Sequence, residues 1–408
     1  MVQQKKIKVF DLFFLLFLML LPLTGRISIK GTVSMNILFA CVLITLLLIK
    51  LSINKKFYFR YDKKLVFLIF IFIILNILSY FFAHSKMLFF TEIKAFIVPI
   101  LIVFLLTIYI QSEKELLRVI NVLFYSGFIV SIVTIIQMII IINTLGYKGV
   151  GVLGNPNYFS GIVACLFPIA SYKLINNKIN IFNIIIYSTY ILAIIISFSK
   201  TAWISGIITV IYFSMSKKPK KILFTIIVFI FIWLVMSNVS NYLNFESILL
   251  KTIEGFNATS RKILLMVSMK IIKNNFIFGV GLGNYPLHTY NYSYMYKNYY
   301  PGSVSHNIFT DILSETGIIN FIIFIFILHR VIKNITYKRN FIQNNSLKKV
   351  FLLSFFLIIL YTSTHGSGRT FYYLWIWIAI GIKVRYLYME KGEIGYVKGK
   401  NKTLDSDN

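Results

Sequence analysis

The residue in this sequence best suited to proton transfer is His306, which stands with Asn307 immediately before a long apolar run. An imidazole has an unperturbed pKa of about 6.5, so it can take a proton from a hydroxyl near neutral pH. A histidine at the end of a membrane helix can instead serve only as an interfacial cap. The residue by itself does not decide between these two roles.

Three cations could complete a site with His306, namely Lys200, Arg261 and Arg369. Lys200 follows a Ser-Phe-Ser stretch, Arg261 lies in the longest loop, and Arg369 lies in the segment HGSGRT. Cations that converge near a membrane surface suggest a phosphate-bearing ligand, because arginine offers a two-pronged donor and lysine a point charge. Each cation could instead extend to lipid headgroups.

Two carboxylates follow the histidine, at Asp311 and Glu315. Their spacing of four residues places them on one face of a helix. Glu315 would lie about 13 Å along that helix from His306, and a helical His306 would point the other way. Carboxylates at such depth are costly and face a cavity or a partner. We expect a structural role for Asp311, whereas Glu315 could support either the helix or the site.

A glycine cluster and a run of tyrosines precede the histidine. The cluster GVGLG follows no strand, so we interpret Gly281 and Gly283 as parts of a tight turn beside the site rather than a nucleotide cradle. Seven tyrosines occur between positions 285 and 300. They could bind sugars through ring stacking and hydroxyl hydrogen bonds, or they could form an interfacial belt.

Motifs for metal or cofactor chemistry are missing, since the chain has no HExxH, Walker loop or CxxC. The two cysteines, Cys41 and Cys165, both lie in apolar runs and give no disulfide framework or metal spacing. We therefore expect metal-independent chemistry without a cofactor.

The composition is that of a polytopic membrane protein. Of 408 residues, 58% are hydrophobic and 13% are charged, and the mean hydropathy is +0.79. The apolar residues come in blocks of roughly 20, the length that crosses a bilayer as a helix. We predict an all-α fold with about twelve transmembrane helices, because membrane strands are shorter and alternate in polarity. The expected spans are 9–25, 33–51, 64–83, 88–110, 117–142, 158–175, 180–198, 201–216, 221–237, 306–328, 350–364 and 370–388.

The net charge of +29 is mostly a topology signal rather than a sign of nucleic-acid binding. With the N-terminus inside, most of the lysines and arginines fall in cytoplasmic segments. This orientation makes both termini cytoplasmic, with 389–408 as a tail, and it places the histidine and the three cations on the outer side. The first apolar run lacks a cleavage site, so we expect it to remain as a helix.

The chain is expected to form a single membrane domain over 1–408 with one large extracytoplasmic loop at 238–305. Loops of this length in a compact protein are usually functional. Within it, the segment 260–274 mixes lysines and arginine with apolar residues, which is typical of a helix lying on the membrane face. We see no pair of interrupted helices of the kind that marks many secondary transporters.

Four segments resemble the O-antigen ligase and O-antigen polymerase superfamily. In chain order they are GNPNYFSGIVACLFPIA, SFSKTAW, SRKILLMVSMKIIKNNFIFGVGLGNY and SHNIFTDILSETGIINF. The motifs cover roughly 150 to 320, and the topology resembles the family over the whole chain. The resemblance implies an enzyme of the cytoplasmic (inner) membrane that moves a glycan from a polyprenyl diphosphate, such as undecaprenyl diphosphate, to a hydroxyl of a glycan or lipid acceptor.

The family's functional histidine falls on His306 and its loop arginine on Arg261. Another family arginine falls on Lys200, where lysine keeps the charge but loses the bidentate grip. Two other classes of function remain open from the residues. A transporter or flippase for lipid-linked sugars would use the same cations without a base, and a non-catalytic scaffold for envelope assembly would tolerate loss of the histidine.

Overall fold

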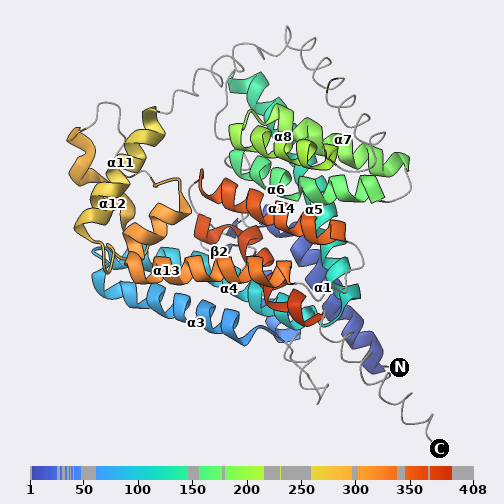
Figure 1. Ribbon diagram of the computed structural model, residues 1–408, viewed down its shortest axis with the longest axis horizontal. Coiled ribbons are helices and arrows are strands. Elements are labelled where there is room, and N and C mark those ends of the chain that lie inside the picture. Colours follow the sequence, from blue (N-terminus) through green and yellow to red (C-terminus); the bar gives the residue numbers. More distant parts are fainter. Residues whose placement is uncertain are drawn as a thin grey trace, which may run out of the picture. The chain divides into compact units, whose positions relative to one another are not determined.

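The computed structural model describes most of the chain, and nearly all of what it describes is helical (Figure 1). The described residues are 2–24, 28–29, 33–34, 36, 38–39, 41–46, 61–145, 156–176, 180–215, 230, 259–295, 302, 304–337, 345–365 and 368–387. Two short strands, β1 (Ser28–Ile29) and β2 (Val33–Ser34), pair antiparallel. The all-α prediction is confirmed apart from this small hairpin.

The helices and 3-10 turns that the structure describes are α1 (Val2–Thr24), α3 (Lys63–Leu78), η1 (Ser79–Phe82), α4 (Lys86–Tyr109), α5 (Glu113–Leu145), α6 (Pro156–Asn176), α7 (Ile181–Ile196), α8 (Lys200–Ser214), α11 (Thr259–Asn274), α12 (Tyr285–Thr289), η2 (Tyr290–Met295), α13 (Ile308–Thr336), α14 (Asn345–Thr362), η3 (Gly368–Thr370) and a last helix over 372–387. These helices overlap most of the predicted spans, and α11, α12 and η2 lie in the predicted loop.

Five helical segments among the described residues are long and apolar enough to cross a membrane. They are Lys63–Phe82, Lys86–Tyr109, Glu113–Ile140, Asn157–Asn176 and Ile308–Thr336. Phe10–Leu23 and Ile181–Ile196 are shorter apolar helices. Part of the span expected at 33–51, nearly all of 221–237 and the tail 389–408 lie outside the described residues. The membrane class is therefore confirmed, while the count of about twelve spans stays a prediction.

The chain divides into two compact units. The first contains α1, most of α5, α6, α7, α8 and 353–361, and its helices α6, α7 and α8 pack together. Within this unit, Tyr190 links α7 to α5, because its hydroxyl donates to the Phe124 carbonyl at 2.8 Å. The second unit contains α3, α4, α11, α12, α13 and the last helix. It also holds residues 304–307, here called the histidine loop, which include His306.

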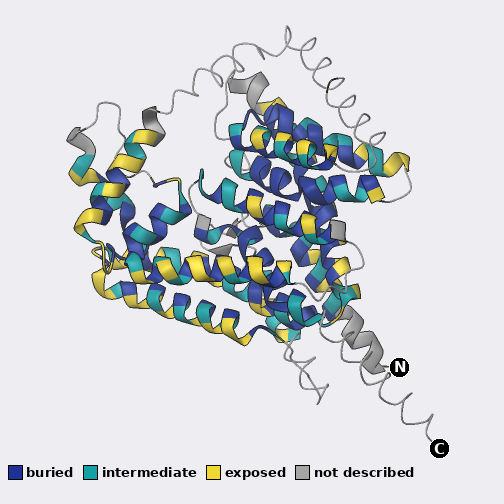
Figure 2. Ribbon diagram, in the orientation of Figure 1, coloured by how far each residue is buried: buried dark blue, intermediate teal, exposed yellow. Residues whose placement is uncertain are grey.

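In the second unit, α3 and α13 lie side by side and form its central packing interface (Figure 1). Phe72 of α3 packs against Phe324 of α13, with ring centroids 5.7 Å apart, and also against Trp375 of the last helix. The opposite side of α3 exposes large apolar residues along its length, as expected for a surface that meets lipid (Figure 2).

The large loop carries short helices where the structure describes it, as predicted. One face of α11 packs Val267 and Ile271 against Val280 and Tyr285, which follow it in the chain. Its other face exposes Leu265, Met266 and Met269 together with lysines at 262 and 273. That combination suits a membrane surface, and the position of α11 on the membrane stays a prediction.

A buried carboxylate fastens the far end of α13 to α3. Asp62 caps α3 by accepting from the amides of Lys64 and Leu65, and it also accepts from Arg330 Nε and Asn334 Nδ2, each at 2.7 Å. Burial alone would raise the pKa of Asp62, but the hydrogen bonds from Arg330 and Asn334 outweigh it and hold the pKa below its usual value.

We predict that Asp62→Ala lowers the free energy of unfolding by about 3 kcal/mol, because Arg330 loses its partner and α3 its cap. The depressed folded pKa means that Asp62 stabilises the protein above the pKa of the unfolded carboxyl, about 3.9, and that this stability is lost as pH falls through the folded value. Thermal unfolding in detergent at pH 7 and pH 3 measures both effects. An equal loss in the variant at both pH values would contradict the linkage.

Candidate active site

His306 lies outside the helix that follows it. The side chain is exposed, and its backbone has a φ of 57°, which is uncommon for a residue other than glycine. Helix α13 begins at Ile308, and its cap is Asn307, whose Oδ1 accepts from the amides of Phe309 and Thr310. His306 is therefore not the residue that caps α13, and its role as a base stays a prediction.

The residue before the histidine is tied to the first turn of α13. Ser305 is buried, and its hydroxyl donates to Asp311 Oδ1 at 2.5 Å. It also accepts from the Asn307 amide at 3.2 Å and from Thr310 Oγ1 at 3.0 Å. The carboxylate of Asp311 thus has a partner in the histidine loop, in addition to the structural role expected for it.

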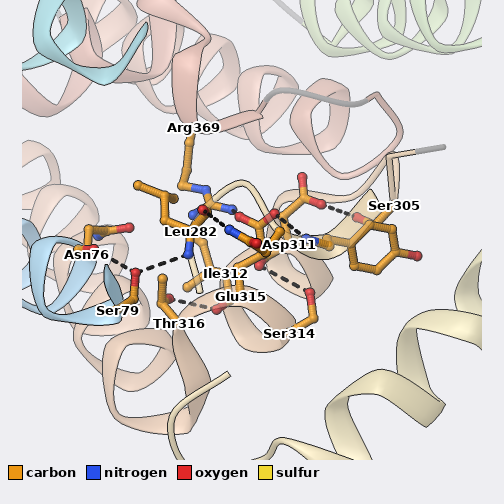
Figure 3. Close-up of polar contacts among 12 residues, drawn as sticks. Asn76, Ser79, Leu282, Ser305, Asp311, Ile312, Ser314, Glu315, Thr316 and Arg369 are labelled. Atoms are coloured by element: carbon orange, nitrogen blue, oxygen red, sulfur yellow. Dashed lines mark hydrogen bonds and ion pairs between the residues drawn. The ribbon is translucent and has the colours of Figure 1, made fainter. Parts of the chain in front are cut away.

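One turn further along, Glu315 is buried and forms an ion pair with Arg369 (Figure 3). Glu315 Oε1 also accepts from the Tyr285 amide at 3.2 Å. Burial would lower the pKa of Arg369, but the carboxylates of Glu315, Asp311 and Glu92 outweigh it and raise the pKa above its usual value. Arg369 therefore stays charged at all working pH values.

The guanidinium of Arg369 is only partly used by these contacts. Nη2 donates to Glu315, whereas Nη1 is buried and has no hydrogen-bond partner in the described part of the chain. The backbone carbonyl of Arg369 accepts from Trp375 Nε1 at 2.6 Å, which fixes the base of the side chain. An unsatisfied donor on a buried cation is costly, so Nη1 is a candidate contact for an anion.

The glycine cluster packs into a break in α13. Gly317 leaves the helical conformation, with φ 77° and ψ 179°, and interrupts the helix ladder. The glycine loop, residues 279–283, supplies hydrogen bonds that replace those lost from the helix. Val280 N donates to Ser314 O at 2.9 Å, and Gly281 N donates to Glu315 O at 2.8 Å. Ile318 N donates in turn to Phe276 O at 3.0 Å. Backbone groups freed within a membrane need such partners. This break was not predicted from the sequence.

Gly281 and Gly283 make the turn that was predicted, and both have positive φ values. The turn is also clamped to the connection between α3 and α4. Leu282 N donates to Ser79 Oγ at 3.1 Å, and Asn284 exchanges hydrogen bonds with the backbone of Ser85. Ser79 and Asn284 gave no signal in the sequence, because their partners are distant in the chain.

We predict that Gly281→Ala destabilises the protein by about 3 kcal/mol, since φ is +89° and a Cβ would collide with the backbone of Ala83. The melting temperature in detergent measures the effect. Gly206→Ala is the matched control, because Gly206 lies within α8 and its Cβ would meet only the side chain of Ile194, at 3.3 Å. Equal melting temperatures for the two variants would contradict the prediction.

The structure does not show where the other two predicted cations, Arg261 and Lys200, lie relative to His306. Arg261 lies in the first turn of α11, within the same unit as His306, but its side chain is outside the described part. Lys200 opens α8 in the other unit, after a turn in which buried Phe198 has a φ of 49°. Convergence of both cations on the histidine stays a prediction.

The tyrosines differ in their surroundings. Tyr285 is buried, with its hydroxyl 2.8 Å from Ser268 Oγ, so this ring cannot stack on a sugar. Tyr292 accepts from Asn274, and Tyr290 is exposed. The positions 296, 299 and 300 lie outside the described residues. No cluster of three or more His, Cys, Asp or Glu side chains suits a metal among the described residues.

Comparison with known protein families gives a match over part of the chain. Residues 185–325 match the family described as O-antigen ligase, and this segment includes Lys200, Arg261, His306 and Glu315. The match confirms the family resemblance and contains three of the four motifs, whereas the first motif, at 154–170, and Arg369 lie outside it. The curated proteins contain no match to the chain.

Proposed function

For this membrane protein, whose residues 185–325 match the O-antigen ligase family, we propose a role in polysaccharide biosynthesis, namely glycan transfer from a polyprenyl diphosphate to an acceptor hydroxyl. The reaction takes place on the outer face of the cytoplasmic membrane. The observation that supports this proposal most strongly is the position of His306, exposed outside α13 within the matched segment. The proposed acceptor is a glycan or a lipid, and membrane lipids surround the protein.

His306 is the general base in the proposed reaction. It takes the proton from the acceptor hydroxyl while that oxygen attacks the anomeric carbon of the donor sugar. The bond between the anomeric carbon and the phosphate oxygen breaks, and the polyprenyl diphosphate leaves with the electron pair. Direct displacement inverts the configuration at the anomeric carbon.

The cations hold the diphosphate and offset the charge that grows on it as the bond breaks. Arg261 and Lys200 are the proposed contacts from the matched segment, and Arg369 contributes the nitrogen that Glu315 leaves unpaired. Stabilising the leaving group in this way contributes about 10²–10³ in rate. Gly281, Gly283, Asn307 and Glu315 support the site through the turn, the cap and the ion pair described above.

The transporter alternative gains one observation, the break in α13, because interrupted helices build the binding sites of many transporters. In those transporters, however, backbone carbonyls freed by the interruption coordinate the transported or coupling ion. In this protein the carbonyls of Ser314 and Glu315 accept from the glycine loop and are already satisfied. The break therefore serves to seat the loop, and it does not favour transport.

Purified protein in vesicles, supplied with a fluorescent lipid-linked glycan and an acceptor, tests the proposal. We expect a new glycosidic product with inverted configuration, formed equally well in the presence of EDTA. Movement of the labelled lipid across the bilayer without product would indicate a transporter, and neither outcome would indicate a scaffold. Loss of product with EDTA would contradict the metal-independent mechanism.

Within the enzyme class, the size of the surface glycan separates a ligase from a polymerase. Deletion of a polymerase should leave short, unjoined repeat units. Deletion of a ligase should leave full-length glycan on the lipid carrier. Gel analysis of glycans extracted from a deletion strain measures the difference.

A further inference from the structure

The hydroxyl of Ser305, the residue before His306, contacts the backbone of Asn307, the residue after it. The Asn307 amide donates to Ser305 Oγ at 3.2 Å, and Ser305 Oγ lies 3.0 Å from the Asn307 carbonyl oxygen. These contacts close a small ring across the histidine, of the type that serine side chains form in turns. Within the ring, His306 takes the left-handed conformation with a φ of 57°. The bend that presents the imidazole is therefore held by the side chain of its neighbour.

Asp311 anchors this ring to α13. Its Oδ1 accepts from Ser305 at 2.5 Å, the shortest contact described for that hydroxyl, as expected when the acceptor is a carboxylate. Thr310 Oγ1 donates to the same hydroxyl at 3.0 Å. Asp311 is 8% exposed, and the charges of Glu315 and Arg369 act on it. The carboxylate that anchors the ring is therefore buried and interacts electrostatically with the buried ion pair.

Helix capping does not account for this arrangement. Asn307 already accepts from the amides of Phe309 and Thr310, so the first turn of α13 has its cap. The carboxylate of Asp311 bonds the loop side chain instead. Because a buried carboxylate is costly unless it is hydrogen-bonded, the contact of Asp311 with Ser305 indicates a role in holding the loop.

We propose that Asp311 is a positioning residue for glycan transfer and that it acts on His306 through the hydroxyl of Ser305. The carboxylate of Asp311 accepts a hydrogen bond from the Ser305 hydroxyl and fixes its position. The hydroxyl in turn stabilises the left-handed backbone at His306, which orients the imidazole toward the acceptor. This inference rests on the proposed role of His306 as the base. Ser305 and Asp311 then contribute to transfer by orienting His306, without contacting the substrate themselves.

Steady-state transfer assays with conservative pairs test the inference. Ser305→Ala and Asp311→Leu should each lower kcat by about 10²-fold, with KM for the donor changed by less than about threefold, because orientation of the base affects the reaction more than binding. Ser305→Thr keeps the hydroxyl and Asp311→Asn keeps an acceptor oxygen, so both should retain kcat within about tenfold. The control is Ser314→Ala, which removes a buried hydroxyl bonded to the Thr310 carbonyl in the same helix.

A double variant separates positioning from general support of the fold. In the His306→Ala background, Ser305→Ala should cause no further loss of residual transfer, because it acts only through the imidazole. A further loss equal to that in the wild-type background would overturn the inference. So would an inactive His306→Ala beside fully active Ser305→Ala and Asp311→Leu. Normal transfer by His306→Ala would overturn the proposed function itself, and the inference with it.

Discussion

Replacing His306 with alanine should reduce glycan transfer by about 10²–10⁴-fold, the usual contribution of a positioned general base. The protein should still fold and insert, because the His306 side chain is exposed and its neighbour Asn307 caps α13. The loss should appear in kcat, since the imidazole is proposed to act on the acceptor hydroxyl and not on the diphosphate. Transfer by purified protein in vesicles, with saturating donor and acceptor, measures it.

The matched control for this prediction is His329→Ala. His329 is an exposed histidine near the opposite end of the same helix, so its replacement tests loss of an imidazole without loss of the proposed base. It should transfer glycan at the wild-type rate. Added imidazole should partly restore transfer by the His306→Ala variant if a base is what it lacks. Full activity of His306→Ala would refute the assignment.

The helices and the histidine's location could be read from the sequence, because they depend on local properties. Apolar runs of membrane length become helices whatever their neighbours are. The cap at Asn307 and the turn at Gly281 likewise reflect the preferences of single residues. The left-handed conformation of His306 could not be read in this way, since it depends on Ser305 and Asp311 acting together.

The contacts that build the site are the ones that the sequence did not show. Glu315 and Arg369 are far apart in the chain, and so are Leu282 and Ser79. The break at Gly317 was also hidden. A single glycine in an apolar helix is common, and only the loop that replaces its hydrogen bonds makes a break tolerable in the membrane.

The tyrosines show the converse, because residues that are grouped in the sequence are separated by the fold. Their composition suggested one shared surface for sugars or for the membrane interface. The fold separates them instead, because Tyr285 packs against α11 while Tyr290 stays exposed. Residue type predicted the possible contacts, and burial decided which of them are available.

Replacing Arg369 with alanine should destabilise the protein by about 3–5 kcal/mol, because Glu315 is left in a buried site without its partner. Two more carboxylates, Asp311 and Glu92, also interact with this guanidinium and would add their repulsion. Transfer should fall as well. The fall alone would not reveal whether Arg369 contacts the diphosphate, because an unstable protein also loses activity.

A double variant, Arg369→Met with Glu315→Gln, resolves this ambiguity. It removes both charges of the pair while the glutamine still accepts from the Tyr285 amide. Stability should therefore return to within about 1–2 kcal/mol of the wild type, as when buried ion pairs are replaced together. We expect transfer to stay low and KM for the donor to rise, since Nη1 no longer reaches the diphosphate. Recovery of both melting temperature and transfer would show instead that Arg369 serves only to hold Glu315 and the glycine loop.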